Sequence, residues 1–522
     1  MKTLALRIAL LGTAAVLTAC GSDTPTSTVD TSNARGTLVD NPPFRIASVN
    51  AATLAAELGA SASGMQLLRV TGAPACGVDF NYMHYWTVNA SPTGDVAASA
   101  SAALMVPTGA SPGCSGPRPI LLYAHATETN KSANLADITD PNNSEGALIA
   151  AMFAAQGYIV VAPNYVGYDT SDGSFHPYLN ANAQSKDMID ALAAARKALG
   201  KVLANTTTDS GKLFISGYSQ GGYVAMATHK AIQAAGQTVT ASAPMSGPYA
   251  LEAFGDAVFF GNVDLGSTVF TPLLTTSFQK SYANIYASTS DVFEAAYAGS
   301  IEGLLPSATP IDQLISTGKL PQLQLFHNTV WNTGSAQLDA TLDVPANPLF
   351  ALGFGPANLV KDSYRLAYIM DALAHPDGAV PAQTNLLPAG AGPNTAPANT
   401  LRQAFALNDL RSWVPAAPVF MCGGHQDPVV FFSVNTQVMQ AFWTFVAPPA
   451  SPLLVNVLDV DSAPTGPNDP FLLAKGGFAQ TEAAIDAGAG GGAAGQQART
   501  QTYHTTVAPF CSAAARGFFS QF

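Results

Sequence analysis

The sequence predicts an α/β fold with a mostly parallel central sheet, antiparallel strands at its N-terminal side and a helical insertion. Three observations indicate this arrangement. Short apolar runs typical of buried strands alternate with helical segments over residues 119–245 and again over 418–519. Residues 66–106 instead hold strand-like runs separated by turn residues, as antiparallel strands do. Between 249 and 410 the alternation stops, so we expect this segment to lie over the sheet.

The composition limits the class of protein. Of 522 residues, 48% are hydrophobic and only 11% are charged, and the formal net charge is −12. A chain this apolar can bury a large core and is not a disordered polyelectrolyte. An acidic chain that is poor in charge lacks the basic surface that binds nucleic acid, so we expect no nucleic-acid partner.

The N-terminus, residues 1–19, is predicted to be an export signal. An apolar stretch from Ile8 to Thr18 follows two basic residues and is too short for a membrane span of about 20 residues. The end of this stretch and the two residues after it, Leu17-Thr18-Ala19-Cys20, resemble a bacterial lipobox. The resemblance implies lipidation of Cys20 and anchoring to the cell envelope, at the outer membrane or cell surface. The alternative is an ordinary signal peptide with a chance cysteine. Residues 20–44 are predicted to be a flexible tether.

Four further cysteines remain if Cys20 is lipidated: Cys76, Cys114, Cys422 and Cys511. An even number in an exported chain predicts two disulfides, and three pairings are possible. We favour Cys76–Cys114 with Cys422–Cys511, because each pair would join neighbouring segments of the predicted fold. No Cys-x-x-Cys or His-x-x-x-His spacing occurs, so we expect no metal site.

The individual elements follow from local composition. β-Branched and aromatic runs bounded by Gly, Pro or Asp are typical of strands, and Ala-rich stretches with one apolar face are typical of helices. The first part of the core, residues 45–248, is predicted to hold strands at 66–71, 82–88, 96–106, 119–124, 158–162, 212–216 and 239–245 and helices at 146–156, 185–199 and 222–235. The second part, residues 411–522, is predicted to hold strands at 418–422 and 453–459, helices at 434–445 and 513–519, and a low-complexity loop at 487–495.

Two segments match Gly-x-Ser-x-Gly, a motif that can place a nucleophilic serine at a sharp turn. Gly217-Tyr218-Ser219-Gln220-Gly221 lies between a predicted strand and a predicted helix, as such a turn requires. Gly109-Ala110-Ser111-Pro112-Gly113 precedes no helical pattern, and Pro112 has no N–H to donate to an oxyanion. We therefore predict that Ser219 is the nucleophile and that Ser111 is a turn residue.

A serine nucleophile needs a base against its hydroxyl. In the strand-turn-helix architecture the chain order is serine, acid, histidine. Asp427 follows the strand at 418–422, and His504 is the one histidine after it. We predict that Asp427 is the acid and His504 the base, in a loop between the last strand and the last helix. The alternatives are a turn aspartate and a surface histidine. His425 is the rival base, but it lies two residues from the acid.

Two backbone N–H groups are predicted to form an oxyanion hole. One belongs to Gln220, directly after the nucleophile, and the other to Thr127, in the loop after the strand at 119–124. The N–H of Ala126 is the alternative to that of Thr127. His125 is expected to support this loop rather than to take part in chemistry.

The insertion, residues 249–410, begins just after the strand that ends at Met245, at the edge of a parallel sheet where ligands bind. It has few charges and many large apolar residues: Phe254, Phe259, Phe260, Phe270, Leu273, Leu274, Phe350, Leu352 and Phe354. These residues either build the insertion's own core or cover a pocket. We expect a cap over the pocket, with Tyr218, Ser246 and Tyr249 in contact with substrate.

The chain resembles the α/β-hydrolase superfamily, and within it the secretory lipases of the lipase A type and bacterial exported lipase/esterase lipoproteins. The resemblance rests on residues 162–168, 176–178 (His-Pro-Tyr), 217–222 and 418–427, and covers roughly 66–250 and 405–522. Asn164 stands where the family has an aspartate. The resemblance implies an esterase or lipase with the insertion as its lid, and it implies no metal or organic cofactor.

Three function classes remain to be compared. A serine carboxylester hydrolase for uncharged apolar esters agrees best with the complete set of serine, acid and histidine and with the apolar insertion. An exported serine peptidase of the same fold is the first alternative. A non-catalytic surface lipoprotein that uses the same scaffold for binding is the second. The sequence leaves open the acyl chain, the alcohol and the oligomeric state.

Overall fold

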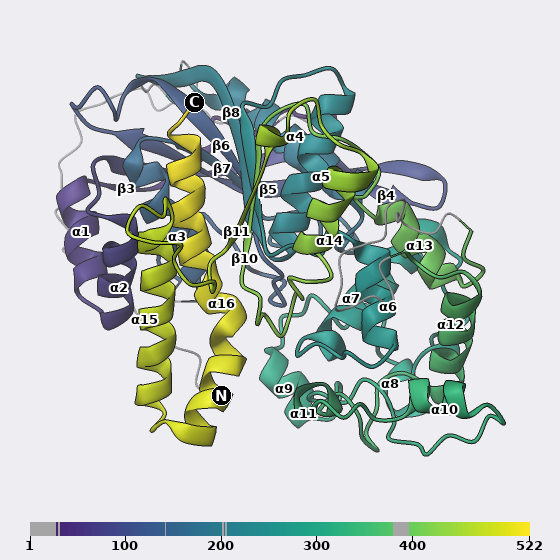
Figure 1. The fold of residues 1–522 in the computed structure, drawn as a ribbon. Coiled ribbons are helices and arrows are strands. Elements are labelled where there is room, and N and C mark those ends of the chain that lie inside the picture. Colours follow the sequence, from purple (N-terminus) through teal and green to yellow (C-terminus); the bar gives the residue numbers. More distant parts are fainter. Residues whose placement is uncertain (1–27, 30–31, 141, 201–202, 204–205, 379–395) are drawn as a thin grey trace.

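The computed structural model describes residues 28–29, 32–140, 142–200, 203, 206–378 and 396–522. The predicted signal peptide and Cys20 lie outside these residues. A nine-stranded sheet of order β11-β10-β9-β8-β6-β7-β5-β4-β3 runs through the molecule (Figure 1). No helix in the described ranges is long and apolar enough to cross a membrane.

The sheet is antiparallel at one side and parallel at the other. Strands β3 (Phe44–Val49), β4 (Gly77–Ser91) and β5 (Gly94–Thr108) are antiparallel to their neighbours, and β5 pairs antiparallel with β7 (Ile159–Pro163). The parallel strands are β6 (Gly116–Ala124), β7, β8 (Thr207–Tyr218), β9 (Ala241–Met245), β10 (Val419–Gly423) and β11 (Val455–Asp459). A separate pair joins β1 (Thr28–Val29) to β2 (Asp40–Asn41). This sheet confirms the predicted fold class.

Helices cover both faces of the sheet, and the alternation of side chains along each strand makes the two cores separate. One core, with Ile120 and Leu122, packs under α4 (Ala181–Ala198), α5 (Gln220–Ala234) and α14 (Thr436–Ala441). The other, with Leu121 and Tyr123, packs under α2 (Ala62–Thr71), α3 (Ser144–Met152), α15 (Leu472–Gly488) and α16 (Gly492–Phe519). Figure 1 shows the two helical layers on either side of the sheet. Shorter elements are α1 (Ala51–Gly59), η1 (Ala154–Gln156), η3 (Phe442–Val446) and η4 (Pro452–Leu454).

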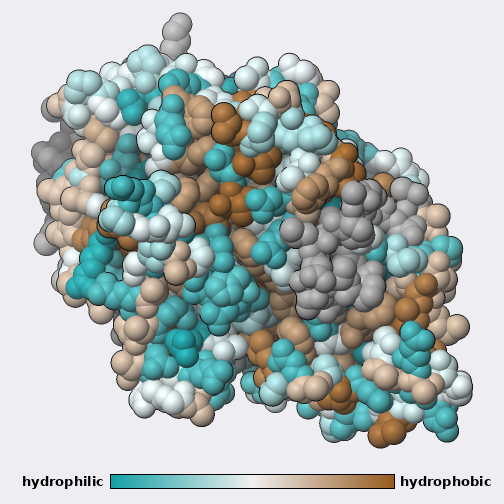
Figure 2. Space-filling model, viewed as in Figure 1, coloured by the Kyte–Doolittle hydropathy of each residue, from teal (hydrophilic) through white to brown (hydrophobic). Residues whose placement is uncertain are grey.

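Between β9 and β10 the chain adds no strand to the described sheet and forms a helical cap, seen at the lower right of Figure 1. Its elements are α6 (Leu251–Phe259), α7 (Ser267–Tyr282), η2 (Thr289–Asp291), α8 (Ala295–Ala298), α9 (Ile311–Ser316), α10 (Ala336–Leu342), α11 (Pro348–Ala351), α12 (Asp362–Ala374) and α13 (Thr400–Asn408). Figure 2 shows a hollow on this face between the cap and the lower ends of α15 and α16.

Buried arginines join the cap's helices. Arg402 on α13 is fully buried and binds Glu252 and Asp256 on α6 at 3.2 and 2.8 Å and Asp371 on α12 at 2.9 Å. Arg411, also buried, pairs with Asp377 and Asp409. A buried ion is retained only when its partners replace its hydration. Removal of one partner from such a cluster would leave a charge without water, so α6, α12 and α13 behave as one unit.

The two disulfides have the predicted pairing, Cys76–Cys114 and Cys422–Cys511, with Cα atoms 5.4 and 5.6 Å apart. The first ties the start of β4 to the turn before β6. The second ties the end of β10 to α16. Both lie in the buried core.

Two local predictions were wrong. Residues 66–71 belong to helix α2, because Ser61 caps its start and Gly72, at φ +77°, ends it. The low-complexity stretch 487–495 is the end of α15 and the start of α16, joined by a tight turn. The turn needs positive φ values, and its glycines adopt them readily, whereas alanine does not.

The tether predicted over 20–44 is also shorter than expected. Leu38 and Val39 are buried against the sheet. The N–H of Val39 donates to the carbonyl oxygen of His84 on β4 at 2.8 Å, and Arg35 pairs with Asp190 on α4 at 2.9 Å. The described chain is therefore packed from about Arg35 onward.

Candidate active site

Ser219 occupies a strained turn between β8 and α5. Its φ of +57° lies in the left-handed region that serine rarely adopts. The turn is possible because its neighbours carry no Cβ: a Cβ on Gly221 would lie 1.9 Å from the carbonyl oxygen of Ala124, and one on Gly222 would lie 2.2 Å from that of Met245. Strained backbone at a single serine between a strand and a helix is typical of a nucleophile elbow.

Ser111 lies elsewhere. It precedes β6, whereas Ser219 follows β8, and these two strands are parallel. The two serines are therefore at opposite ends of the sheet. Ser111 is exposed and begins a turn in which its own carbonyl oxygen accepts from the N–H of Cys114.

Asp427 and His504 form a short hydrogen bond, with Oδ2 of Asp427 2.6 Å from Nδ1 of His504. The other oxygen, Oδ1, accepts from the N–H groups of Val429 and Val430 at 2.9 and 3.1 Å, which fixes the carboxylate. Because Nδ1 of His504 faces a carboxylate, which accepts a hydrogen bond, the hydrogen of the neutral ring lies on Nδ1 and Nε2 carries the lone pair. Nε2 of His504 is buried and has no hydrogen-bond partner among the described residues.

His504 lies within α16, not in a loop as predicted. Tyr218, directly before Ser219, holds the helix at this point: its hydroxyl donates to the backbone carbonyl oxygen of His504. Tyr218 is 4% exposed and supports His504. Its contact with substrate stays a prediction. Ser246 and Tyr249 are buried as well, beneath the start of the cap.

A polar network joins the loop of Asp427 to the helix of His504. Asp461 accepts from the hydroxyl of Tyr503 at 2.7 Å and from Nε2 of Gln426 at 2.9 Å. The same Tyr503 hydroxyl accepts from the N–H of Gln426 at 3.3 Å. His425 points to Asp459, with Nδ1 2.8 Å from its carboxylate, and its side chain is 47% exposed. His425 thus binds a different acid from the one that binds His504.

The loop after β6 distinguishes between Thr127 and its alternative, Ala126. The N–H of Ala126 donates to both carboxylate oxygens of Glu145, at 3.1 and 3.2 Å, so it is not free for an oxyanion. No hydrogen bond to another described residue takes up the N–H of Thr127. The N–H of Gln220, at the first turn of α5, likewise lacks an intrahelical acceptor.

Two residues singled out in the sequence have structural roles near this loop. His125 is buried, stacks on Tyr165 with ring centroids 4.1 Å apart, and lies between the carbonyl oxygens of Ala126 and Asn164. Asn164 accepts from the N–H of Leu135 and donates to the hydroxyl of Ser101. An amide side chain can both accept and donate a hydrogen bond, whereas an ionised aspartate at this position could only accept.

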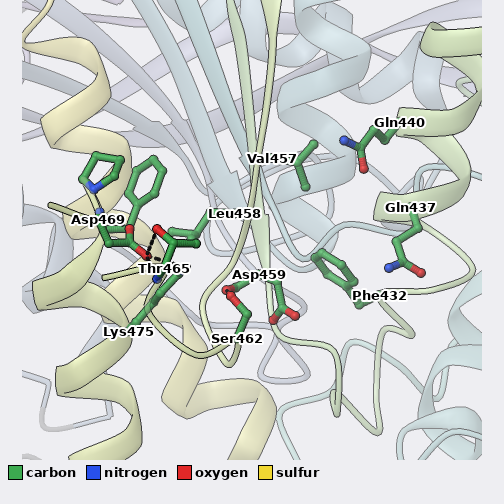
Figure 3. A pocket seen from close by; sticks show the side chains of 12 residues that line it. Phe432, Gln437, Gln440, Val457, Leu458, Asp459, Ser462, Thr465, Asp469 and Lys475 are labelled. Carbon is green, nitrogen blue, oxygen red and sulfur yellow. Dashed lines mark hydrogen bonds and ion pairs between the residues drawn. The ribbon is translucent and has the colours of Figure 1, made fainter. Parts of the chain in front are cut away.

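A separate cavity of about 460 Å³ lies at the outer edge of the sheet, along β11. Figure 3 shows side chains from the loop after β11 and from α14 and α15 around it, with the buried Lys475–Asp469 pair on one wall. Asp459, which binds His425, reaches this cavity, but Ser219, Asp427 and His504 do not line it. Among the described residues no cluster of side chains could hold a metal ion.

Solved structures of other proteins share the overall fold of this chain. The rice cell wall degrading esterase LipA from Xanthomonas oryzae is 26% identical, with a TM-score of 0.60 over 83% of this chain and 92% of that one. Its ligand-bound form gives a TM-score of 0.64 at 24% identity, over 93% and 98%. A putative hydrolase from Legionella pneumophila is 18% identical, with a TM-score of 0.59 over 92% and 96%.

The model of the prolyl oligopeptidase family matches residues 146–259, which include Ser219. No curated protein matches the chain. Together with the nine-stranded sheet, these similarities show that the chain has the α/β-hydrolase fold, and they support a hydrolase.

Glu145 should make stability depend on pH. Burial raises its pKa to about 7 from 4.5, although hydrogen bonds from Tyr123 and Ala126 oppose the shift. The folded protein therefore holds a proton between about pH 4.5 and 7 that the unfolded chain releases, so the free energy of unfolding falls as pH rises through this window. Glu145→Gln lacks this dependence. Between the lower and the higher pH, the free energy of unfolding of the variant should rise relative to that of wild type by on the order of 3 kcal/mol.

Urea unfolding of both proteins across that window measures the difference. A difference that stays constant with pH would mean that Glu145 is ionised throughout.

Proposed function

We propose that the protein is a serine carboxylester hydrolase that acts on uncharged, apolar esters. The observation that carries the proposal is the Asp427–His504 hydrogen bond of 2.6 Å. Tyr218 contacts this histidine and directly precedes Ser219, which lies in a strained strand-to-helix turn. The buried Nε2 of His504 is left to accept a proton. The contact between Tyr218 and His504 brings the residue before the nucleophile against the base.

In the proposed mechanism Oγ of Ser219 attacks the ester carbonyl carbon while Nε2 of His504 takes its proton. The carbonyl oxygen becomes an oxyanion held by the N–H groups of Gln220 and Thr127. His504 then gives the proton to the leaving alcohol, and the acyl group remains on Ser219. A water molecule, deprotonated by His504, releases the carboxylic acid. Asp427 keeps Nδ1 of His504 protonated and stabilises the imidazolium during both acylation and deacylation.

The acyl group is proposed to lie in an aromatic crevice between the cap and the chain after Asp427. Phe254 on α6 and Phe350 on α11 both contact Phe431, with ring centroids 5.4 and 5.6 Å apart. Phe254 and Phe350 are partly exposed, whereas Phe259 and Phe354 are buried in the cap's own core. Phe260 and Phe270 are partly exposed as well. We choose Phe254 and Phe350 because both contact Phe431, in the chain after Asp427.

The peptidase alternative has one observation in its favour, the match of residues 146–259 to the prolyl oligopeptidase family. The esterase LipA is similar over a much larger share of the chain. A non-catalytic lipoprotein is the remaining alternative. A panel of p-nitrophenyl esters of increasing chain length beside prolyl p-nitroanilides separates the three: ester turnover supports the proposal, anilide turnover alone supports the peptidase, and neither supports a binding protein.

Export and a lipid anchor at Cys20 complete the proposal. Two disulfides between buried cysteines agree with an oxidising compartment outside the cytoplasm. An anchored enzyme would meet its ester at the cell envelope. Labelling with a palmitate analogue, lost in Cys20→Ala, would test the anchor.

Replacing the nucleophile or the base should abolish activity. Ser219→Ala and His504→Ala should each lower kcat by at least about 10⁴-fold, and the double variant should be no worse, because the residues act as a unit. Ser111→Ala and His425→Ala are the matched controls and should keep kcat within about fivefold. Steady-state kinetics on p-nitrophenyl butyrate measures this. Full activity of Ser219→Ala would refute the mechanism.

Removing the two disulfides should have unequal effects on catalysis. The loops of 38 and 89 residues predict a loss of about 4 kcal/mol in the free energy of unfolding for either pair. Only Cys422–Cys511 joins the strand before Asp427 to the helix of His504. Cys422→Ala/Cys511→Ala should therefore lower kcat by about tenfold or more at temperatures where it remains folded.

Cys76→Ala/Cys114→Ala is the control and should keep kcat within about twofold at the same temperature. Equal losses of kcat in both double variants would show that the Cys422–Cys511 bridge has no special effect on the site.

The aromatic crevice should set chain-length preference. Phe254→Ala and Phe350→Ala remove apolar surface that an acetyl group does not reach but a longer chain does. Each should lower the ratio of kcat/KM for octanoate to that for acetate by about tenfold, with the acetate value nearly unchanged. Leu352→Ala, a half-exposed cap residue, is the control. An unchanged ratio in both variants would place the acyl group elsewhere.

A further inference from the structure

The tripeptide His176-Pro177-Tyr178, in the loop before α4, has no part in the chemistry proposed above. Both outer side chains are nevertheless 3% exposed and polar. The N–H of Tyr178 donates to the carbonyl oxygen of His176 at 2.8 Å, which closes a tight turn around Pro177. Because proline fixes its own φ, this turn holds the two side chains at a set spacing.

His176 binds the side chain of Gln220. Its Nδ1 lies 2.9 Å from the carbonyl oxygen of Val166, which can only accept, so Nδ1 carries the hydrogen. The neutral ring then has a lone pair on Nε2, and Nε2 of Gln220 donates to it at 2.7 Å. Burial lowers the pKa of His176 to about 3, which keeps the ring neutral. His176 therefore holds the side chain of Gln220, the first residue of α5.

Tyr178 binds the side chain of Thr127, with the two hydroxyl oxygens 2.8 Å apart. The ring of Tyr178 packs against Phe270 of the cap on its other side, with centroids 6.5 Å apart and planes 18° apart. On the other side of Thr127, Glu145 holds the N–H of Ala126. Thr127 is therefore held by Glu145 through its neighbour and by Tyr178 through its hydroxyl.

We propose that His176 and Tyr178 are positioning residues of the oxyanion hole, each holding the side chain of one of the two residues whose N–H groups receive the negative charge. This inference rests on the proposed function. Neither residue reaches the reacting atoms, and one rigid turn sets both contacts. The distance between the two N–H groups then depends on this turn as well as on β6 and β8.

Such residues act mainly in the transition state, because the oxyanion forms only there. Removing an oxyanion donor itself costs about 10²–10³ in kcat. Loss of a group that only positions a donor should cost less, and it should lower kcat and kcat/KM equally while KM stays constant. A trifluoromethyl ketone, which forms a tetrahedral oxyanion on the serine, should lose affinity by the same factor.

The first test is a double-variant cycle on Tyr178 and Thr127. Tyr178→Phe and Thr127→Val should each lower kcat on p-nitrophenyl butyrate by about tenfold, with KM within twofold, and the double variant should equal the worse single variant. Tyr286→Phe, which removes a buried cap hydroxyl bonded to Glu302, is the matched control and should leave kcat unchanged. Inhibition constants for the ketone should follow kcat.

The second test uses His176. His176→Gln keeps an acceptor near the position of Nε2 and should retain most of kcat, whereas His176→Leu removes it and should behave like Tyr178→Phe. Kinetics at a temperature below the melting points of all variants separates these effects from unfolding.

The inference is overturned if Tyr178→Phe matches Tyr286→Phe, if the losses appear in KM, or if ketone affinity does not change while kcat falls. Additive losses in the double variant would also contradict it. These outcomes leave the proposed function intact as long as hydrolysis depends on Ser219. Activity that survives Ser219→Ala would instead refute the proposed function.

Discussion

The hydrogen bond between Asp427 and His504 joins two segments that are 77 positions apart in the chain, and the site depends on it. Such a long separation gives the contact no local support, so other interactions must hold the two segments together. Three do so: the Cys422–Cys511 disulfide, the network of Asp461 with Tyr503 and Gln426, and the bond from Tyr218 to the backbone of His504. Each starts from a different element.

Buried ionisable groups organise the loop after β6 and the cap. Glu145 lies in the core and takes up the N–H of Ala126, which leaves the N–H of Thr127 as the proposed oxyanion donor of this loop. In the cap, Arg402 collects three carboxylates from two helices. In both places an ionisable group is kept where water is excluded, and its partners fix backbone that has no regular secondary structure or belongs to different helices.

The sheet and the position of Ser219 could be predicted from local patterns, and the disulfide pairing from the order of segments in the predicted fold. The elbow is recognisable because a strand, a serine between glycines and a helix are contiguous. His504 could be predicted by chain order, but not its helix, because residues 496–506 are rich in Gln and Thr and show no apolar period. The roles of Tyr218 and Glu145 depend on contacts across the fold, which leave no local signal. The residues 66–71 were misjudged because a short apolar run fits a strand and a helix equally well.

Helix α16 carries both His504 and, seven positions later, Cys511. Seven residues are about two turns, so both side chains leave the same face of the helix, roughly 10 Å apart along its axis. A helix held at one point can still roll about its axis or pivot on that point. The disulfide at one level and the contacts of Tyr503 and His504 at the other remove both freedoms. The imidazole is then tied to the carboxyl end of β10, so His504 and Asp427 keep their relative position when either segment moves.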